Sequence, residues 1–474
     1  MKVRIFSILG VAFLLGFISV TLGQEKEKKV EQAQSEKVEQ PQGEMIFMPI
    51  IKLCSDVTTE GINACGNGIS ACGKIAGSTS RFAYDLLTDP TRFTDVTHVD
   101  TSGLALSTSA TTVYQQNVHG GLSTHNKRGR FAGRYQVELA GETAKLLGIE
   151  NGGFYLKASG AWSESGDITG PSIGSKFDIN DKCKPRRSMD LEEAWYQHNF
   201  LDGKFSVRIG KMDPKGGFAC DGRAVAFAKN AFASSSTSQF LNSALCTVKN
   251  IPFPQNGLGV ALFYNHNDFW YIAGEITDAD ADSRETGFNT AFHGTENYFS
   301  IFETGIVPKF NSDNGVLTGA YRLGMWYDPK PKRCSGATKY YRDDTGLYVD
   351  IDQDLIKENN DEKCRQGLGT FFRYGLAEGK KNDVTNFWSF GFQYRGLFEG
   401  RDSDVMGIGF ASGVFSDSSS TYKENQEDIY ELYYNIKVAK KINLTPSVQY
   451  IKDPGGKNLA DDALAIGLRL HMTF

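Results

Sequence analysis

The C-terminal segment alternates strictly between two kinds of side chain, and this alternation constrains the fold more than any other feature of the sequence. One set is wholly apolar: Leu464, Ile466, Leu468, Leu470, Met472 and Phe474. The other set is small, polar or cationic: Ala463, Ala465, Gly467, Arg469, His471 and Thr473. Successive side chains of a β-strand point to opposite faces, so the pattern predicts a strand with one apolar face and one polar face.

The same alternation recurs in about fifteen segments between residues 110 and 474, separated by polar stretches rich in turn residues. Short connections, as at 201–203 and 440–441, alternate with long ones at 212–256 and 328–366. Short turns at one end and long loops at the other are typical of outer-membrane barrels, whose strand number is even in bacterial single-chain examples. We therefore expect an all-β, antiparallel transmembrane barrel of about sixteen strands over residues 105–474.

A soluble β-sandwich or β-helix would also have strands with one apolar face, buried in a protein core. Two features favour a membrane barrel over these folds. Tyrosines lie near strand ends, as at Tyr321, Tyr327, Tyr430 and Tyr434, where they would form interfacial girdles. The last strand also remains apolar up to Phe474, whereas the ends of soluble domains are usually poorly ordered.

Composition excludes several other classes of protein. The 474 residues include 51 Lys+Arg and 56 Asp+Glu, for a net charge of −5. The absence of a basic surplus argues against nucleic-acid binding. No long apolar run follows the first 23 residues, which argues against a bundle of transmembrane helices.

The N-terminal part predicts export and an envelope-facing extension. Residues 1–23 combine Lys2, Arg4 and a 16-residue apolar stretch at 5–20, which is shorter than the roughly 20 residues of a membrane-spanning helix. They therefore predict a cleaved signal peptide. Residues 24–104 comprise a charged linker and a cysteine-containing region. We expect this segment to face the periplasm as a tether, a partial plug or an arm that contacts a partner such as the cell wall.

The even number of cysteines favours disulfides in an exported chain. The eight are Cys54, Cys65, Cys72, Cys183, Cys220, Cys246, Cys334 and Cys364. Of the 105 connectivities that eight cysteines allow, the preferred single pair is Cys334 with Cys364, closing the stretch 328–366. No CxxC motif or nearby histidine supports a zinc site.

No catalytic signature is present. The sequence lacks GxSxG, HExxH and P-loop motifs. The adjacent carboxylates Glu192 and Glu193 would lie on a strand and point to opposite faces, which prevents them from acting as an acid/base pair. We expect a protein that is not an enzyme and that needs no cofactor or metal.

If the apolar faces contact lipid, the alternation directs a set of polar and aromatic side chains into the lumen. Buried arginines are costly unless they meet water or a partner, so a water-filled channel accounts for a whole row of them. Arginine, glutamate and aromatic groups suit neutral polar solutes such as sugars, whereas phosphate would favour a lysine-rich lining, which is not apparent. The alternative is that each arginine only braces the wall. The predicted pore-lining residues are Arg208, Arg322, Arg373, Arg395, Arg469, Glu193, Trp195, Trp326 and Phe371.

Three stretches resemble the carbohydrate-selective porin family, also called the OprB family. The first is LEEAWYQHNFLDGKFSVRIGKMDP at 191–214. The second is GTFFRYGLAEG at 369–379, followed at 391–416 by a stretch that contains the GRDSDVMGIGFA core. The third is ELYYNIKVAKKINLTPSVQYIKDPGG at 431–456, closed by DALAIGLRLHMTF. The resemblance covers about residues 110–474.

The resemblance implies a sixteen-stranded outer-membrane barrel that passes small carbohydrates by facilitated diffusion, and it suggests a homotrimer. It also implies an arginine-containing constriction beside aromatic residues. That role carries over to the matching positions Glu193, Trp195, Arg208, Phe371, Arg373, Arg395 and Arg469, while Arg322 and Trp326 rest on alternation alone. Arg401, in the GRD motif, would lie at a turn and be structural.

Two other functions remain open from the sequence. One is a general or anion-preferring diffusion porin. The other is a secreted, soluble, β-rich protein that binds polysaccharides.

Overall fold

The structure, a computed structural model, describes residues 98–99 and 103–474 apart from 127, 165, 185–186, 221, 283, 293–296, 361–363, 423–425 and 457–458. The predicted signal peptide and nearly all of segment 24–104 lie outside the described residues, so their roles stay predictions. Within the described ranges, none of the helices has the length and apolar character needed to cross a bilayer.

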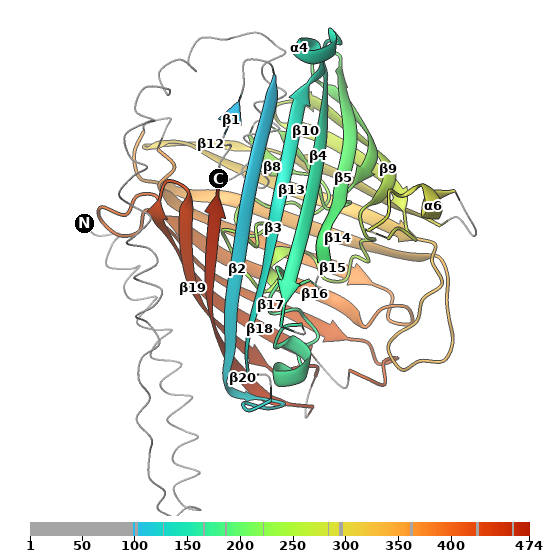
Figure 1. Cartoon of the computed structure of the whole chain (residues 1–474), viewed down its shortest axis with the longest axis vertical. Helices are drawn as coiled ribbons and strands as arrows, with labels where there is room; N and C mark the ends of the chain where they lie inside the picture. Colours follow the sequence, from blue (N-terminus) through green and yellow to red (C-terminus); the bar gives the residue numbers. More distant parts are fainter. Residues whose placement is uncertain are drawn as a thin grey trace, which may run out of the picture. The chain divides into compact units, whose positions relative to one another are not determined.

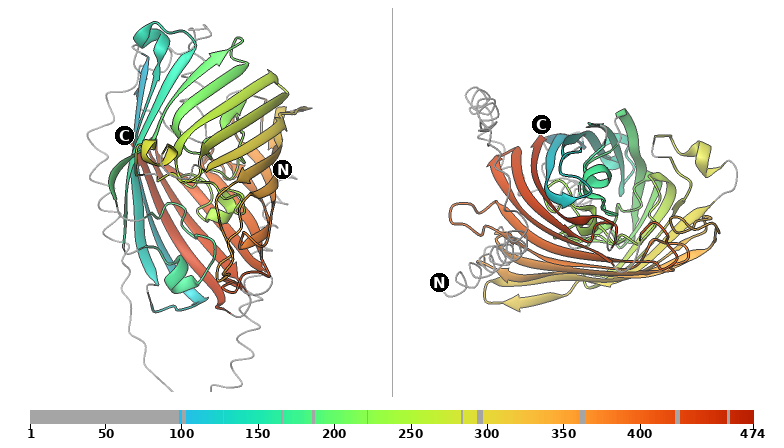
Figure 2. Two further views of the ribbon diagram at one scale, coloured as in Figure 1. Left: turned by 90° about the vertical axis from the view of Figure 1, so that its right-hand side faces the viewer. Right: turned by 90° about the horizontal axis from the view of Figure 1, so that it is seen from below.

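Sixteen antiparallel strands form a closed barrel (Figures 1 and 2). The ring closes where the first barrel strand pairs with the last, from Ser109 opposite Thr473 to Gly121 opposite Asp461. The strands are β2 (Leu104–Gly121), β3 (Gly129–Glu142), β4 (Gly152–Ser163), β5 (Arg187–Phe200), β6 (Phe205–Met212), β9 (Gly257–Asn267), β10 (Trp270–Asp278), β11 (Tyr298–Ile306), β13 (Gly315–Asp328), β14 (Asp344–Lys357), β15 (Gly367–Ala377), β16 (Val384–Arg395), β17 (Val405–Phe415), β18 (Gln426–Ala439), β19 (Ile442–Lys452) and β20 (Asp461–Thr473).

The remaining elements are short. Strand β1 (His98–Val99) pairs with β2, β12 (Lys309–Ser312) pairs with β13, and β7 (Phe218–Cys220) pairs with β8 (Arg223–Val225). The helical turns are α4 (Thr143–Leu147), a π-helix at Thr169–Ile173, α5 (Ser243–Cys246) and α6 (Phe288–Ala291).

The predicted alternation of side chains is confirmed. On β13, Leu323 is 55% exposed whereas its neighbour Arg322 is 2% exposed. On β15, Phe372 is 40% exposed and Phe371 is 1% exposed. Apolar side chains therefore cover the outside of the barrel, where they would contact lipid, and polar or aromatic ones point inward.

The two ends of the barrel have connections of different length. Positions 201–204, 268–269 and 440–441 are tight turns at one end. At the other end, residues 213–256 join β6 to β9, and residues 329–343 join β13 to β14. In outer-membrane barrels the short turns face the periplasm and the long loops face outward.

The prediction of a single long loop at 328–366 is wrong, because β14 occupies its centre. The sequence DTGLYVDIDQDLIK alternates, but its inward set includes Asp344, Asp350 and Asp352. These carboxylates made the segment resemble a solvated loop.

The preferred disulfide between Cys334 and Cys364 is also wrong. The two cysteines lie in the connections at opposite ends of the 14-residue strand β14, and both are free. Such a strand is roughly 45 Å long, whereas a disulfide requires Cα atoms within about 7 Å. Cys183, Cys220 and Cys246 also form no disulfide within the described residues, and Cys54, Cys65 and Cys72 lie outside them.

A charge on the outer face tests which medium the barrel contacts. Leu323→Arg would place a guanidinium near the middle of β13, and the expected cost is about 2–4 kcal/mol at the bilayer midplane. We expect loss of assembled barrel in outer-membrane fractions, measured by the heat-modifiable band shift. Leu323→Phe, which keeps the face apolar, should assemble normally, and equal assembly of the two variants would contradict a lipid-facing position.

Candidate functional site

Two connections fold into the barrel instead of extending from its end, as the axial view in Figure 2 shows for the green segments. We call residues 166–184 the first inner loop and residues 213–256, described apart from 221, the second inner loop. They meet inside the barrel, where Asp181 N–H donates to the Leu241 carbonyl at 3.0 Å and Ser243 N–H donates to the Asp178 carbonyl at 2.8 Å. Together they decide what space remains for a solute.

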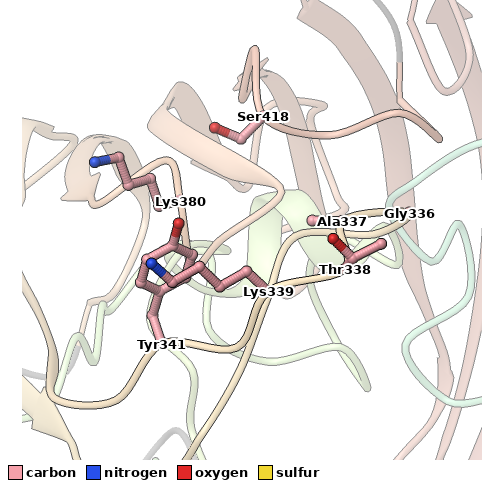
Figure 3. A pocket seen from close by; sticks show the side chains of 7 residues that line it. All are labelled: Gly336, Ala337, Thr338, Lys339, Tyr341, Lys380 and Ser418. Atoms are coloured by element: carbon pink, nitrogen blue, oxygen red, sulfur yellow. The ribbon is translucent and has the colours of Figure 1, made fainter.

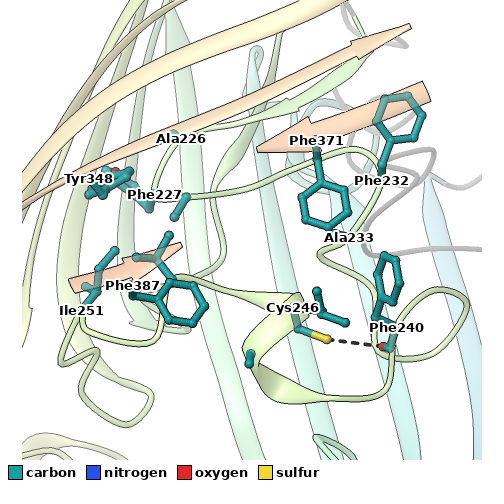
Figure 4. Close-up of a cluster of buried hydrophobic side chains, with 14 of the residues drawn as sticks. Ala226, Phe227, Phe232, Ala233, Phe240, Cys246, Ile251, Tyr348, Phe371 and Phe387 are labelled. Atoms are coloured by element: carbon teal, nitrogen blue, oxygen red, sulfur yellow. Dashed lines mark hydrogen bonds between the residues drawn. The ribbon is translucent and has the colours of Figure 1, made fainter. Parts of the chain in front are cut away.

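The second inner loop packs its apolar side chains against strands β9 to β18 (Figure 4). Phe218 stacks on Phe263 with 4.9 Å between ring centroids, and the Phe240 ring lies 5.7 Å from Phe371 and 4.9 Å from Tyr433. Burying these rings away from water stabilises the loop by the hydrophobic effect. This side of the interior is therefore filled by protein.

Glycines on the inner wall make room for the loop. A Cβ atom added at Gly369 would lie 2.0 Å from the Phe232 ring, and one added at Gly409 would lie 2.8 Å from Phe240. Real Cβ atoms do not approach other heavy atoms so closely, so only glycine permits this contact. Gly409 belongs to the GRDSDVMGIGFA motif, which gives that glycine a packing function.

Buried arginines of the wall hold the second inner loop by hydrogen bonds to its backbone. Arg322 donates to the Ala224 carbonyl at 2.6 Å, and Arg373 donates to the Leu245 carbonyl at 2.6 Å. Arg469 donates to the carbonyls of Ser236 and Gln239, both at 2.7 Å. These three predicted pore-lining residues lie inside the barrel, and the structure places them beneath the loop.

The carboxylates of β14 complete the charge pairing. Asp350 accepts hydrogen bonds from Arg322 at 3.2 Å and from Arg373 at 3.0 Å. Asp352 accepts from Arg322 at 2.6 Å and from Arg223 of the loop at 2.7 Å. The charges alternate along this row, which compensates groups that would be very unfavourable if buried alone.

Arg208 sits between two aromatic rings at the edge of the same loop. Its guanidinium lies 4.2 Å from the Trp195 ring and 4.3 Å from the Phe218 ring, and it donates to the Gly217 carbonyl at 3.1 Å. Arginine beside aromatic residues is what the family resemblance implies at a constriction, and that role for Arg208 stays a prediction. Here the same geometry also fixes the start of the second inner loop.

The other predicted residues also face the interior. Glu193 accepts from Lys157 at 3.3 Å and from the Trp195 indole N–H at 3.2 Å. Trp326 is buried with its ring 5.3 Å from the Lys332 ammonium. Arg395 is half-buried at the short-turn end of β16, opposite Gly367. A direct contact of any of these residues with solute stays a prediction.

The prediction that Glu192 and Glu193 point to opposite faces is wrong. The pairing of β4 with β5 shifts register between Lys157 and Ala158, so Glu192 is an extra residue in the strand. Such a bulge lets two consecutive side chains turn to one side, and both carboxylates are buried. Glu192 forms an ion pair with Arg134, and Glu193 pairs with Lys157.

The opposite half of the interior is polar, and it contains residues that the sequence analysis did not single out. Lys157 is half-buried on β4, where the alternation of Tyr155, Lys157 and Ser159 could have identified it. Lys182 and Asp181 come from the first inner loop, which Gln115 and Gln449 hold by donating to the Ile179 carbonyl, both at 2.9 Å. No strand pattern predicts that a loop folds inward.

A family model described as "Carbohydrate-selective porin, OprB family" matches residues 126–474. The chain belongs to this family. Porins of this family are channels rather than enzymes, and the family and the barrel fold imply an outer-membrane location.

Known relatives agree with this membership. Porin B of Pseudomonas aeruginosa is 25% identical over 399 residues, covering 76% of this chain and 85% of Porin B. The putative porin QuiX of Acinetobacter baylyi is 23% identical over 344 residues, covering 65% of this chain and 74% of QuiX. A high-pH structure of Pseudomonas putida OprB has the same fold, with a TM-score of 0.67 at 21% identity, covering 79% of this chain and 94% of that chain.

The GRD motif of this OprB-family porin has a structural role, as predicted for Arg401. Both ends of the Arg401 guanidinium donate to Asp404, at 2.7 and 2.9 Å. Asp404 also accepts from the Tyr434 hydroxyl at 2.7 Å and from the Lys437 N–H at 2.9 Å. The motif therefore ties the turn between β16 and β17 to β18.

Asp350→Asn tests whether the buried row formed by Asp350, Asp352 and their arginine partners holds the second inner loop in place. This change leaves Arg322 and Arg373 buried with one less negative charge, at an expected cost of about 3–5 kcal/mol for breaking a buried pair. We expect a lower unfolding midpoint and new tryptic cleavage at Arg223 and Lys229 of the loop. Asp313→Asn, in an exposed turn, is the matched control; unchanged protection in Asp350→Asn would show that the row does not hold the loop.

Proposed function

We propose that the protein allows passive, substrate-preferring diffusion of mono- or small oligosaccharides along the polar half of the barrel, between the two inner loops and strands β2 to β6, β19 and β20. The observation that carries this proposal is the unequal division of the interior. Apolar rings of the second inner loop pack on the side of β9 to β18, while residues such as Arg134, Gln136 and Lys157 on the opposite side remain partly exposed. A solute that needs hydrogen-bond partners would follow the polar side.

The charges on this polar side are paired at short range, which favours neutral polar solutes. Arg134 pairs with Glu192, and Lys157 pairs with Glu193. Paired groups still offer hydrogen-bond donors and acceptors to sugar hydroxyls, while the net electrostatic field of each ion pair is small. A sugar that enters would give up hydrogen bonds to water and form weak ones to these side chains, so it can leave again.

In this proposal the predicted arginines divide into two roles. Arg322, Arg373 and Arg469 position the second inner loop and set the width of the passage. Arg208, with Trp195 and Glu193, lies where the loop meets the polar wall and contributes to the constriction. Two further proposals come from the sequence, namely assembly as a homotrimer and cell-wall contact through residues 24–104.

An anion-preferring pore is the second candidate, and the cations around Lys182 favour it. Arg134, Lys157 and Arg469 act electrostatically on Lys182, with Asp181 as the opposing charge. Liposome swelling with glucose and maltose, beside anion conductance in planar bilayers, separates the two candidates. Sugar exclusion together with high anion flux would contradict carbohydrate diffusion.

Lys157→Gln tests the polar wall. The change removes one charge-assisted donor from the proposed path, worth about 1 kcal/mol, or roughly a fivefold change in rate if the contact forms in the passage. We expect slower swelling of proteoliposomes in maltose with unchanged barrel assembly. Lys440→Gln, in the exposed turn between β18 and β19, should swell at the original rate; identical rates for both variants would exclude Lys157 from the path.

Lys182 predicts a pH dependence of ion selectivity. Burial, followed by the charge of Arg134, lowers the pKa of Lys182 to about 7. The ammonium is therefore protonated below this pH and neutral above it, so anion preference should fall as the pH rises between about 5.5 and 8.5. Reversal potentials in a KCl gradient measure this change. Lys182→Gln should abolish the pH step, whereas Lys184→Gln, at an exposed neighbour, should retain it.

A further inference from the structure

A pocket of about 300 Å³ lies among the long loops at the end of the barrel, away from the interior site (Figure 3). Three connections that are distant in sequence form it: β13 to β14, β15 to β16, and β17 to β18. Its lining residues are Gly336, Ala337, Thr338, Lys339, Tyr341, Lys380 and Ser418.

Hydrogen bonds beneath the pocket hold the three loops together. Asp383 accepts from the Ser335 N–H at 2.7 Å and from the Ser335 hydroxyl at 2.8 Å, and it pairs with Lys176 of the first inner loop at 2.6 Å. The Ser335 carbonyl accepts from Ser420 N–H at 3.1 Å. The pocket is therefore organised before any ligand arrives, which reduces the entropy lost on binding.

The lining combines cations, hydroxyls and one aromatic ring. Lys339 and Lys380 supply two ammonium groups, and the lining contains no acidic residue. The Lys339 ammonium lies 5.0 Å from the centroid of the Tyr341 ring. Thr338, Tyr341 and Ser418 each supply a hydroxyl, and tyrosine offers an apolar face together with its polar tip.

Nearby carboxylates are already engaged by other groups. Glu378 pairs with Lys381 at 2.7 Å, and Asp343 accepts from the Tyr327 hydroxyl at 2.7 Å. Asp383 is held by Lys176 and Ser335, and these bonds lower its pKa although burial acts in the opposite direction. Asp417 adjoins Ser418 in sequence but does not line the pocket. The lining therefore offers two lysines and no carboxylate to an approaching ligand.

We propose that this pocket binds an acidic saccharide, meaning a sugar that carries a carboxylate or a phosphate group. The lysines would hold the anionic group, the three hydroxyls would contact sugar hydroxyls, and the Tyr341 ring would pack on the apolar face of the sugar. Both soluble acidic sugars and the acidic core of outer-membrane lipopolysaccharide have this chemistry. The inference rests on the proposed carbohydrate function for the class of ligand, but not on passage through the barrel.

Calorimetric titration of the purified full chain in detergent tests the proposal, with galacturonate and glucose 6-phosphate as soluble probes and glucose as the neutral probe. We expect both acidic probes to bind more tightly than glucose, with the difference shrinking as salt is added. Lys339→Gln and Lys380→Gln should each weaken binding of the acidic probes by about two- to fivefold, as for solvent-exposed charge pairs. Lys381→Gln, whose ammonium is held by Glu378, is the matched control and should bind as the original chain does.

A second arm adds lipopolysaccharide as a competitor and distinguishes the two sources of the ligand. If lipopolysaccharide displaces the soluble probes, or if the Lys339→Gln/Lys380→Gln double variant no longer binds it, then lipopolysaccharide binds in the same pocket. Equal binding of glucose and the acidic probes, or unchanged binding by the double variant, would overturn the proposal.

Liposome swelling separates this inference from the proposed channel function. The double variant should pass neutral sugars at the original rate because the pocket lies outside the proposed path. If the original chain binds acidic sugars but passes no sugar, the channel proposal fails and the pocket assignment stands.

Discussion

The structure depends on one constraint, which is that backbone N–H and C=O groups in contact with hydrocarbon must be paired within the protein. A sheet with an open edge would leave a row of such groups unpaired, each costing several kcal/mol in lipid. Pairing of β2 with β20 removes that edge. Once the ring is closed, the pleat determines which side chains face lipid and which face inward, and the interior becomes a separate environment.

A second requirement is that the two inner loops stay in place inside the barrel, although ordering them costs conformational entropy. Apolar rings such as Phe218 and Phe240 bury area against the wall, and the buried row formed by Asp350, Asp352 and their arginine partners fixes the position. Hydrophobic contact alone is non-directional, whereas bonds from Arg322 and Arg373 to loop carbonyls define one arrangement. The arginines that a sequence pattern associates with a solute are thus, in large part, parts of the scaffold.

Much of the barrel was predictable because one period dominates its strands. The alternation in β13, β15 and β20 gave the correct lipid and lumen faces, including those of Arg322, Phe371 and Arg469. Strand β14 was not predicted because its inward aspartates look like residues of a solvated loop. The bulge at Glu192 was not predicted because one extra residue leaves no local signal in the sequence. The inner loops were not predictable, since their partners lie on strands that are distant in sequence. Arg373 of β15, for example, donates to the Leu245 carbonyl of the second inner loop, 128 residues away.

The packing of the second inner loop has a consequence for how such a channel can diversify. The circumference of a sixteen-membered ring is fixed by backbone pairing, so it cannot be adjusted in small steps. In the proposed passage the aperture, by contrast, is set by the second inner loop, an insert whose Phe232 and Phe240 rings rest against Gly369 and Gly409. Trimming or enlarging that insert would retune the size cutoff while the cylinder itself stays untouched.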